Sequence, residues 1–343
     1  MIVAGVLAWT FVGCGDDDGG GTDAGPGVDS GPGTDSGPDV DAGPGVDAGP
    51  VDRCGDGLEL PAGSAFPEGI TMGDDGTLYV GTIGTGQILS YPGAAEPAQE
   101  LVAMGDTFGN VIGLLFDSDR SILWACNSNL ADFTGAAVVG VDPSDGSVAV
   151  RHAFPSDPGF CNDLALDADG NLYVTDTVGH RILRLPAADA MTADSLELWT
   201  DDAVLAVSAG EFGLNGIAVI DSDVYVVIFQ TGAVFRIGIQ GSGNAGAIEE
   251  LNVDTTLMGP DGLKAFGATT LGVVQNFGGE LTRLEVSGTD VTATTIQGGL
   301  DAPSTFVMDD GAGIAWVVES QIDDLLAGSA PDTPFCVRRV PVP

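Results

Sequence analysis

The chain has 343 residues and a formal net charge of −40 at pH 7, with 50 acidic residues against only 10 Lys and Arg. A surface this acidic repels nucleic acid and anionic lipid, so both are excluded as binding partners. The five cysteines form no Cys-x-x-Cys pair, which excludes a zinc motif of that type.

The first 13 residues, MIVAGVLAWTFVG, form a short apolar run that ends directly before Cys14. This pattern resembles a bacterial lipoprotein signal peptide, although no basic residue precedes the run and Phe11 replaces the usual Leu. A transmembrane helix is disfavoured, because spanning a bilayer takes roughly 20 residues. We therefore expect acylation of Cys14, export, and lipid anchoring to the bacterial cell envelope, at the outer membrane or cell surface.

Residues 14–52 continue as a repetitive segment. After Cys14 only Gly, Pro, Asp, Ala, Ser, Thr and Val occur, in units such as DAGPGV and DSGPGT. Such a sequence has nothing large to bury and is expected to be a disordered tether, a more favoured role than weak calcium binding. The tether holds ten Asp and no cation, so −40 + 10 leaves about −30 on residues 53–343.

Residues 53–343 contain six copies of one sequence pattern. When the second residue of each copy is aligned, the spacings are about 44, 50, 53, 46 and 43 residues, which is the range of propeller blades. The aligned residues, called anchor residues below, are Glu68, Ile112, Asn162, Asn215, Asp261 and Ser304.

Each copy has a short apolar strand, a tight turn such as DDG or DADG, an aromatic-rich strand, and a third strand after a Gly-containing turn. More polar segments such as ELVAM and SLELWTD fit the outer edge of a blade. No long apolar pattern of helical period occurs, so helices should be scarce. The sequence predicts an all-β, six-bladed β-propeller with four-stranded antiparallel blades, because closing the ring removes the sheet edges.

If Cys14 is lipidated, four cysteines remain for two disulfides, with three possible connectivities. Cys54 lies just before the first blade and Cys336 lies in the last strand. A bond between them would hold the ring closed, and the pair Cys126–Cys161 would then join adjacent blades. We expect this connectivity.

Four of the anchor residues carry a side-chain carboxylate or amide, and the innermost strand of each blade lines the central channel. Glu68, Asn162, Asn215 and Asp261 would therefore face one another across a narrow space. Apposed carboxylates repel there, and a divalent cation would remove that penalty. The set has no His or Cys, so a hard ion is favoured, Ca²⁺ first and then Mg²⁺ or Mn²⁺; Zn²⁺, a softer ion, is a further alternative. Asn-Gly and Asp-Gly are also ordinary turn signals, so the alternative is that these residues only form turns.

The residues PEGI, CNDL, LNGI and PDGL resemble, in order, the metal-site motifs of the gluconolactonase/regucalcin-like (senescence marker protein) propellers. Related families are the calcium-dependent phosphotriesterases and the paraoxonases. The resemblance implies one catalytic metal held by Glu68, Asn162, Asn215 and Asp261. A disulfide between the propeller's ends, as in paraoxonases, would match Cys54 and Cys336.

Two departures from these families concern the substrate. A substrate-binding Arg of gluconolactonase-like enzymes is replaced by Phe160, and a catalytic His of paraoxonases is replaced by Ile112. A more apolar ester or lactone is therefore favoured over a sugar-acid lactone. Asn162 and Phe160 are candidates for substrate contact. Phe212 and Phe306 are further candidates for the mouth, with a place in the core as the alternative for all three aromatic residues.

The expected activity is metal-dependent hydrolysis of a lactone or related ester (a carboxylic ester or a phosphotriester), with the metal as Lewis acid and Asp261 or Glu68 as general base. The alternative is a non-catalytic, NHL-like binding or scaffold propeller with a structural metal. No Ser-His pair suggests serine catalysis. We expect His180 to be structural, His152 to be an exposed strand residue, and Asp163 to hydrogen-bond backbone. A monomer acting on a small molecule is expected.

Overall fold

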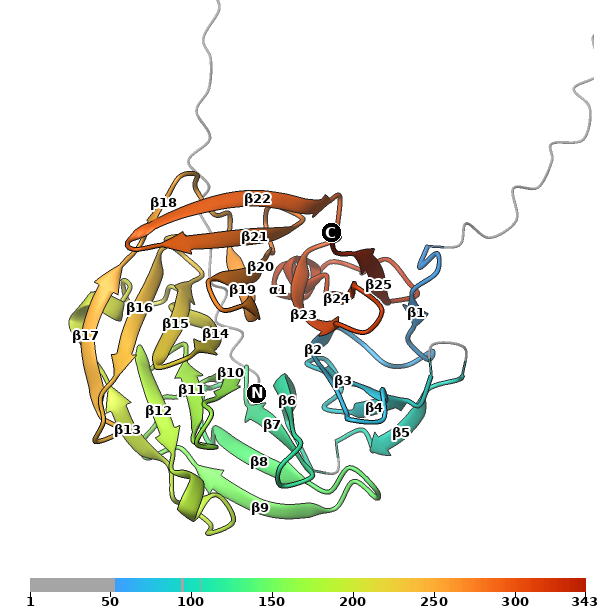
Figure 1. Ribbon diagram of the computed structural model, residues 1–343. Coiled ribbons are helices and arrows are strands. Elements are labelled where there is room, and N and C mark those ends of the chain that lie inside the picture. The colour runs from blue at the N-terminus through green and yellow to red at the C-terminus, as the bar shows by residue number, and fades with distance from the viewer. Residues whose placement is uncertain (1–52, 94–95, 106) are drawn as a thin grey trace, which may run out of the picture. The chain divides into compact units, whose positions relative to one another are not determined.

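The computed structural model describes residues 53–93, 96–105 and 107–343. The predicted signal peptide (1–13), the lipidation site Cys14 and the tether (14–52) lie outside these residues. Six β-sheets are arranged around a central axis (Figure 1). The predicted all-β, six-bladed propeller is confirmed.

Blades one to four each contain four antiparallel strands in simple chain order from the axis outward. Blade one contains β2 (Pro67–Met72), β3 (Leu78–Thr82), β4 (Ile88–Tyr91) and β5 (Gln99–Val102). Blade two contains β6 (Asn110–Asp117), β7 (Ile122–Ser128), β8 (Ala137–Val141) and β9 (Val148–Ala153). Blade three contains β10 (Cys161–Leu166), β11 (Leu172–Asp176), β12 (Arg181–Leu185) and β13 (Glu197–Thr200). Blade four contains β14 (Leu214–Ile220), β15 (Asp223–Ile228), β16 (Val234–Ile239) and β17 (Ala245–Glu250).

The last two blades add short strands to this plan. Blade five contains β19 (Pro260–Gly267), β20 (Thr270–Gln275), β21 (Glu280–Ser287) and β22 (Asp290–Gly298). Its fifth strand is the two-residue β18 (Asn252–Val253), which pairs in parallel with β22. Blade six contains β23 (Pro303–Asp309), β24 (Ile314–Glu319) and β25 (Cys336–Pro341), and its outermost strand is β1 (Leu58–Glu59) from the start of the described chain.

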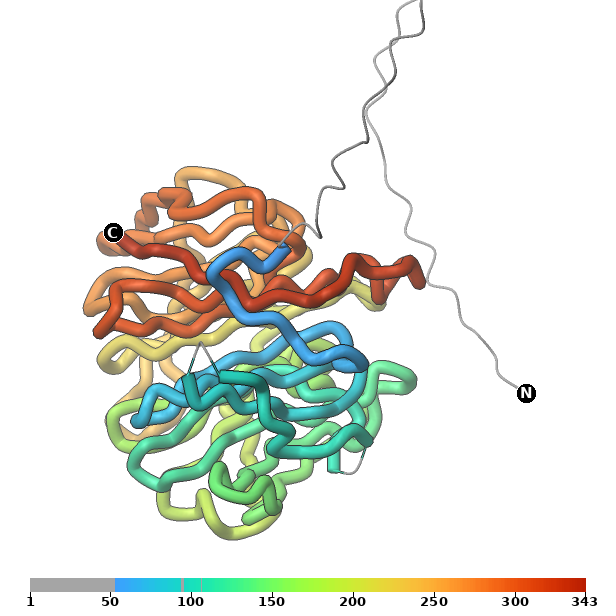
Figure 2. The backbone as a smooth tube through the Cα atoms, turned by 90° about the vertical axis from the view of Figure 1, so that its right-hand side faces the viewer, coloured from blue at the N-terminus to red at the C-terminus, as the bar shows by residue number. Residues whose placement is uncertain are grey.

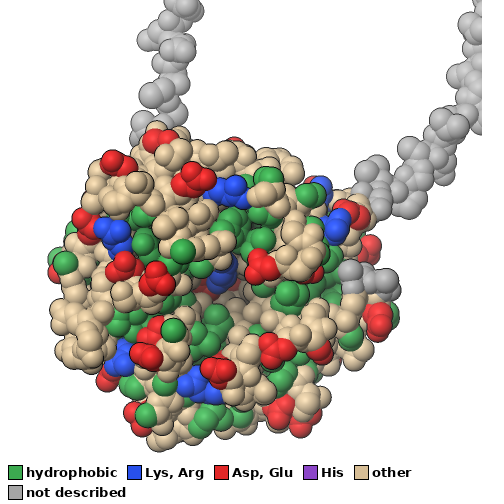
Figure 3. Space-filling view, in the orientation of Figure 1, with side chains coloured by type: hydrophobic (Ala, Val, Ile, Leu, Met, Phe, Trp, Pro, Cys, Tyr) green, Lys and Arg blue, Asp and Glu red, His purple; other side chains and the backbone are tan. Residues whose placement is uncertain are grey.

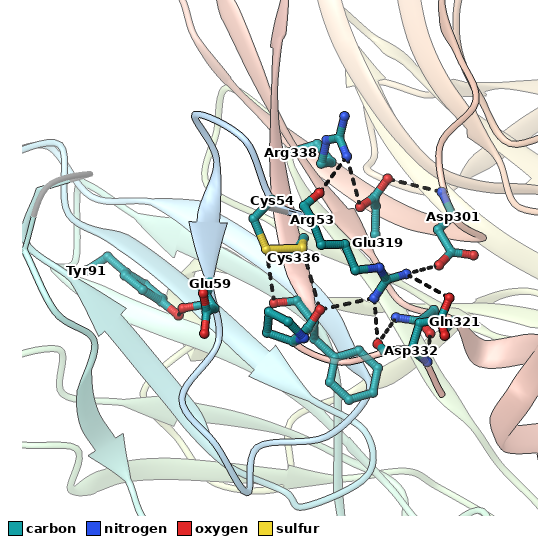
Figure 4. The surroundings of a disulfide bond; sticks show 12 residues. Arg53, Cys54, Glu59, Tyr91, Asp301, Glu319, Gln321, Asp332, Cys336 and Arg338 are labelled. Carbon is teal, nitrogen blue, oxygen red and sulfur yellow. Dashed lines mark hydrogen bonds and ion pairs between the residues drawn. A yellow bond between two sulfur atoms is a disulfide. The ribbon is translucent and has the colours of Figure 1, made fainter. Parts of the chain in front are cut away.

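The ring is therefore closed by β1, which pairs antiparallel with β25. This pairing involves only two residues of β1 and is therefore weak. A disulfide reinforces it: Cys54 and Cys336 are bonded, with an S–S distance of 2.05 Å (Figure 4). The predicted connectivity is present, and the second disulfide joins Cys126 to Cys161. The first bond links residues 282 positions apart, so it restricts the unfolded chain strongly.

Arg53 adds polar contacts to the same closure (Figure 4). Its guanidinium forms an ion pair with Asp301 and donates a hydrogen bond to the carbonyl oxygen of Pro334 at 3.0 Å. Arg338 in turn donates to the carbonyl oxygen of Arg53 at 3.1 Å. These contacts bind the segment before β1 to blade six. The disulfide and the polar contacts of Arg53 therefore close the ring at the same place.

The core consists of six separate hydrophobic layers, one at each blade–blade interface. In the layer between blades two and three, for example, Trp124 packs with Leu164 and Val174, all fully buried. The layer between blades six and one contains Trp316 and Leu78. Burying each large apolar side chain contributes about 1.5–3 kcal/mol, so every interface is a substantial source of stability. The blades are thus held mainly by packing against their neighbours.

Helices are scarce, as predicted. The described residues contain one α-helix, α1 (Ile322–Ala327), and two 3₁₀ turns, at Ala187–Asp189 and Ala203–Leu205. None of these helices is long and apolar enough to cross a membrane. The segment between β24 and β25, which contains α1, projects from one face of the ring in the side view (Figure 2).

The prediction that His152 is exposed is wrong. Its side chain is fully buried, because the segment around the first 3₁₀ turn of blade three covers β9 of blade two. His152 Nε2 lies 2.9 Å from the carbonyl oxygen of Ala190, and Nδ1 accepts a hydrogen bond from the Ser195 N–H at 3.2 Å. Burial lowers the pKa of His152, in keeping with a neutral ring that joins the two blades.

Candidate metal centre

All six anchor residues lie at the same irregularity of their blades. In every blade the pairing of the innermost strand with its neighbour breaks register around the anchor, as at Pro67/Ile70 in blade one and Leu214/Ile217 in blade four. A bulge of this kind re-aims a side chain relative to the regular alternation of the strand. The bulges explain how polar side chains at the start of otherwise apolar strands come to face the channel.

The backbones of neighbouring bulges approach closely enough to require glycine. A Cβ on Gly69 would lie 2.1 Å from the carbonyl oxygen of Ile112, and one on Gly216 would lie 2.2 Å from that of Asp261. Between the last blade and the first, the Ser304 hydroxyl donates a hydrogen bond to the carbonyl oxygen of Glu68 at 2.8 Å. At these contacts the backbone of an anchor is therefore positioned by a neighbouring blade as well as by its own.

Four predicted site residues are brought together on the channel axis. Glu68, Asn162, Asn215 and Asp261 are each less than a tenth exposed, and all four line both of two adjoining cavities. The outer cavity has a volume of about 60 Å³ and the inner one about 10 Å³, the latter just enough for one water-sized occupant. The four side chains thus stand between an outer pocket and a small inner chamber.

The charged forms of the two carboxylates in this group are unfavourable. Burial raises the pKa of Glu68 well above its usual range, and the nearby charges of Asp261 and Asp163 raise it further. Burial and the charge of Asp163 likewise raise the pKa of Asp261, against a hydrogen bond from the Asn215 side chain, which lowers it. The charged forms are therefore destabilised in the metal-free protein, and a bound cation would relieve that cost.

The donor set fits a hard divalent cation. Asn215 Oδ1 is buried and has no hydrogen-bond partner among the described residues, although the Asn215 side chain hydrogen-bonds Asp261. A buried acceptor left unpaired is costly, and an ion beside it would satisfy it. Two carboxylates and two amide oxygens suit Ca²⁺. Within the described residues no group of three or more His, Cys, Asp and Glu side chains could hold a metal, so the two amides are essential to this site.

An ion pair between Asp163 and Lys264, close to the anchor residues, was not predicted from the sequence. Asp163 accepts backbone hydrogen bonds from Leu164 at 2.9 Å and Ile217 at 3.3 Å, as the backbone role predicted for it requires. It also forms an ion pair with Lys264, whose Nζ lies 2.9 and 3.0 Å from its two carboxylate oxygens. In the sequence, Lys264 follows PDGL in an ordinary strand pattern, and only its being the sole lysine of the chain distinguishes it.

Aromatic rings surround one side of the outer cavity. Phe133, Phe160, Phe212, Phe229 and Phe277, the aromatic arc below, contact one another in this order, with ring centroids 6.0, 6.5, 6.4 and 5.0 Å apart. Three of them, Phe160, Phe212 and Phe229, line the cavity. The remaining apolar lining comes from Ile83, Ile112, Leu130, Ile322 and Leu326.

The suggestion that Phe306 belongs to the mouth is wrong. Its side chain is fully buried in the layer between blades five and six, and its ring lies 5.4 Å from that of Phe266, centroid to centroid. Ser304 occupies the bulge of β23, so Phe306 lies beyond the irregular position and faces the neighbouring blade. His180 lies in the turn between β11 and β12 with a left-handed backbone, φ 51°, and its structural role remains a prediction.

The fold and this site together define a six-bladed propeller with an oxygen-lined axial centre. No protein-family model matches the sequence, and no curated protein matches it. Solved structures are similar in fold. A gluconolactonase from Xanthomonas campestris has a TM-score of 0.57 at 15% identity, over 82% of this chain and 87% of that one.

Two other solved structures have similar TM-scores. The calcium-binding protein regucalcin from Agrobacterium tumefaciens has a TM-score of 0.59 at 16% identity, over 83% of this chain and 93% of that one. Virginiamycin B lyase from Staphylococcus aureus has a TM-score of 0.55 at 17% identity, over 83% and 87%. The predicted resemblance to gluconolactonase and regucalcin is thus confirmed as a likeness of fold.

Proposed function

We propose that this protein is a divalent-cation-dependent hydrolase of apolar lactones or related esters, with Ca²⁺ as the favoured ion. The observation that carries the proposal is the unpaired, buried Asn215 Oδ1 beside two destabilised carboxylates at the base of an apolar cavity. The likeness to a gluconolactonase and to a calcium-binding regucalcin supports it at the level of fold.

Glu68, Asn162, Asn215 and Asp261 would hold the cation, which when bound supplies Lewis-acid polarisation of an ester carbonyl. The residues that hold it are fixed by the bulges and by contacts between blades, so little reorganisation is needed during the reaction. Asp261 or Glu68 is the general base, because each is a carboxylate at the cavity floor. Asn215 orients Asp261 through their side-chain hydrogen bond.

The outer cavity favours an uncharged, apolar substrate. Its lining includes eight apolar side chains and no Lys, Arg or His among the described residues, so nothing there would pair with an anionic substrate group. Phe160 and Asn162 are two positions apart in the chain and both line this cavity. An aryl or short alkyl ester, or a lactone with an apolar ring substituent, would place its apolar part against the aromatic arc.

The test is a panel of aliphatic lactones, aryl esters and phosphotriesters, assayed with purified protein in Ca²⁺ and after chelation. Turnover of an apolar carboxylic ester or lactone that is lost with chelator and restored by Ca²⁺ is expected. Asp261→Ala should abolish it while circular dichroism stays unchanged. Wild-type activity in that variant would disprove the assignment of Asp261.

Calorimetric titration with Ca²⁺ separates the two parts of this proposal. Calcium binding without turnover of any substrate in the panel would favour the non-catalytic alternative, a propeller whose metal is structural. Absence of calcium binding would contradict the metal centre itself.

A further inference from the structure

The only lysine of the chain lies inside the propeller. Lys264 belongs to β19 of blade five, and its partner Asp163 belongs to β10 of blade three, so the ion pair reaches past the intervening blade. The Lys264 side chain is 21% exposed and that of Asp163 is 7% exposed. Figure 3 shows a hollow at the middle of the ring with a basic side chain inside it. The single lysine of a chain with 50 acidic residues therefore pairs with a carboxylate of another blade inside the ring.

Asp163 is part of the same charged group as the candidate metal ligands. It lines the inner cavity together with Glu68 and Asp261, and its charge acts on both of these carboxylates. The charge of Lys264 opposes that effect on both. Its two backbone hydrogen bonds, from Leu164 and Ile217, hold Asp163 in place.

The charges of this group balance for only one kind of ion. Three carboxylates contribute −3 and Lys264 contributes +1, so a divalent cation brings the total to zero. Uncompensated charge in a buried space is expensive, which makes this neutrality significant. We propose that Lys264 is a built-in counter-ion for Asp163 that matches the channel to one divalent cation and against a trivalent one. This inference rests on the metal centre proposed above.

Four variants test the charge balance, with Ca²⁺ and La³⁺ as the probes. Lys264→Met leaves −3 and should raise the ratio of La³⁺ to Ca²⁺ affinity by at least about tenfold, since removing a nearby unit charge favours the more highly charged ion. Lys264→Arg, the matched control, should keep the wild-type ratio. Asp163→Asn leaves −1 and should lower the ratio and weaken Ca²⁺ binding. The double variant Asp163→Asn/Lys264→Met restores −2 and should return the ratio to near the wild-type value.

Affinity and stoichiometry are measured by isothermal titration calorimetry of full-length protein at one fixed pH, with circular dichroism as the check of folding. If Lys264→Met fails to fold, Asp163→Asn and the double variant carry the test, because they predict a lowered and a restored ratio. Equal ratios in all folded variants would overturn the role of Lys264 while leaving the metal centre intact. Wild-type protein that binds neither ion would overturn the metal centre, and this inference with it.

Discussion

Replacing Asp261 by Asn should change the stability of the protein in opposite directions with and without calcium. The substitution keeps the shape of the side chain, and its amide oxygen can still accept the hydrogen bond from Asn215. It removes one of the carboxylates whose pKa is raised by burial and by neighbouring charge. In metal-free protein at neutral pH, Asp261→Asn should therefore be more stable than the wild type.

The pH dependence gives the size of the effect. A carboxyl group whose pKa is raised on folding stabilises the protein fully below its unfolded pKa, roughly 4, and this contribution is lost as pH rises through the folded pKa. Each such group lowers the free energy of unfolding by up to about 1.4 kcal/mol per pH unit in that window. In this site the metal-free wild type has two such groups, Glu68 and Asp261, and the variant keeps only Glu68; the raised pKa values of Asp301 and Glu319 act equally in both proteins. The variant should therefore show the shallower decline above pH 4.

Calcium should reverse the order of stability. An ion that binds only the folded state at 100 times its dissociation constant adds about 2.7 kcal/mol to the free energy of unfolding. The wild type should gain this amount at neutral pH and the variant much less, because it has lost a charged ligand. The bound ion also holds both carboxylates ionised, so the part of the decline with pH that Glu68 and Asp261 cause in metal-free wild type should disappear.

Urea unfolding at a series of pH values, in chelator and in saturating Ca²⁺, measures both effects. Asp310→Asn is the control, since it removes the same charge from an exposed turn and should alter neither curve. If Asp261→Asn were less stable than the wild type in chelator, the charged form of Asp261 would not destabilise the metal-free protein. A cation between the two carboxylates would then have no electrostatic basis.

Three further predictions concern closure of the ring and its cavity. Replacing Cys54 and Cys336 together by Ala should destabilise the protein by about 5 to 6 kcal/mol in the chain-entropy treatment of a 282-residue separation, measured by urea unfolding; a loss below about 2 kcal/mol would contradict it. Ser304→Ala leaves the buried carbonyl of Glu68 without its donor and should cost about 1–3 kcal/mol, with an unchanged unfolding midpoint as the refuting result. Phe212→Ala should raise KM for apolar esters several-fold with little change in kcat, and an equal loss for polar esters would refute the role of the aromatic arc.

Periodicity and alignment predicted most of the fold. The six copies predicted the blade number, and the placement of Cys54 before the first blade and of Cys336 in the last strand predicted the disulfide that closes the ring. The two-residue strand β1 was not predicted, because a pair such as Leu58–Glu59 is too short to carry a strand pattern. It becomes a strand only because β25 offers an unpaired edge, which is a tertiary effect.

The errors concern side chains whose surroundings come from another blade. His152 alternates with exposed residues along β9, so its strand pattern indicates an outer edge, and only the fold shows that blade three covers it. Lys264 and Asp163 are 101 residues apart, and nothing local marks them as partners. In a propeller, patterns along one strand predict the blade, whereas contacts across the channel depend on the closed ring.

The anchor positions show why this site could be found from sequence at all. A bulge occurs at the anchor in all six blades, yet only four anchors carry a carboxylate or amide, so the bulge belongs to the fold and these side chains do not follow from it. Ile112 occupies the same irregular position as a fully buried apolar side chain and lines the outer cavity. Because the fold tolerates an apolar residue there, burying Glu68 and Asp261 at equivalent positions is a cost that packing does not require. A bound cation is the simplest physical reason for that cost.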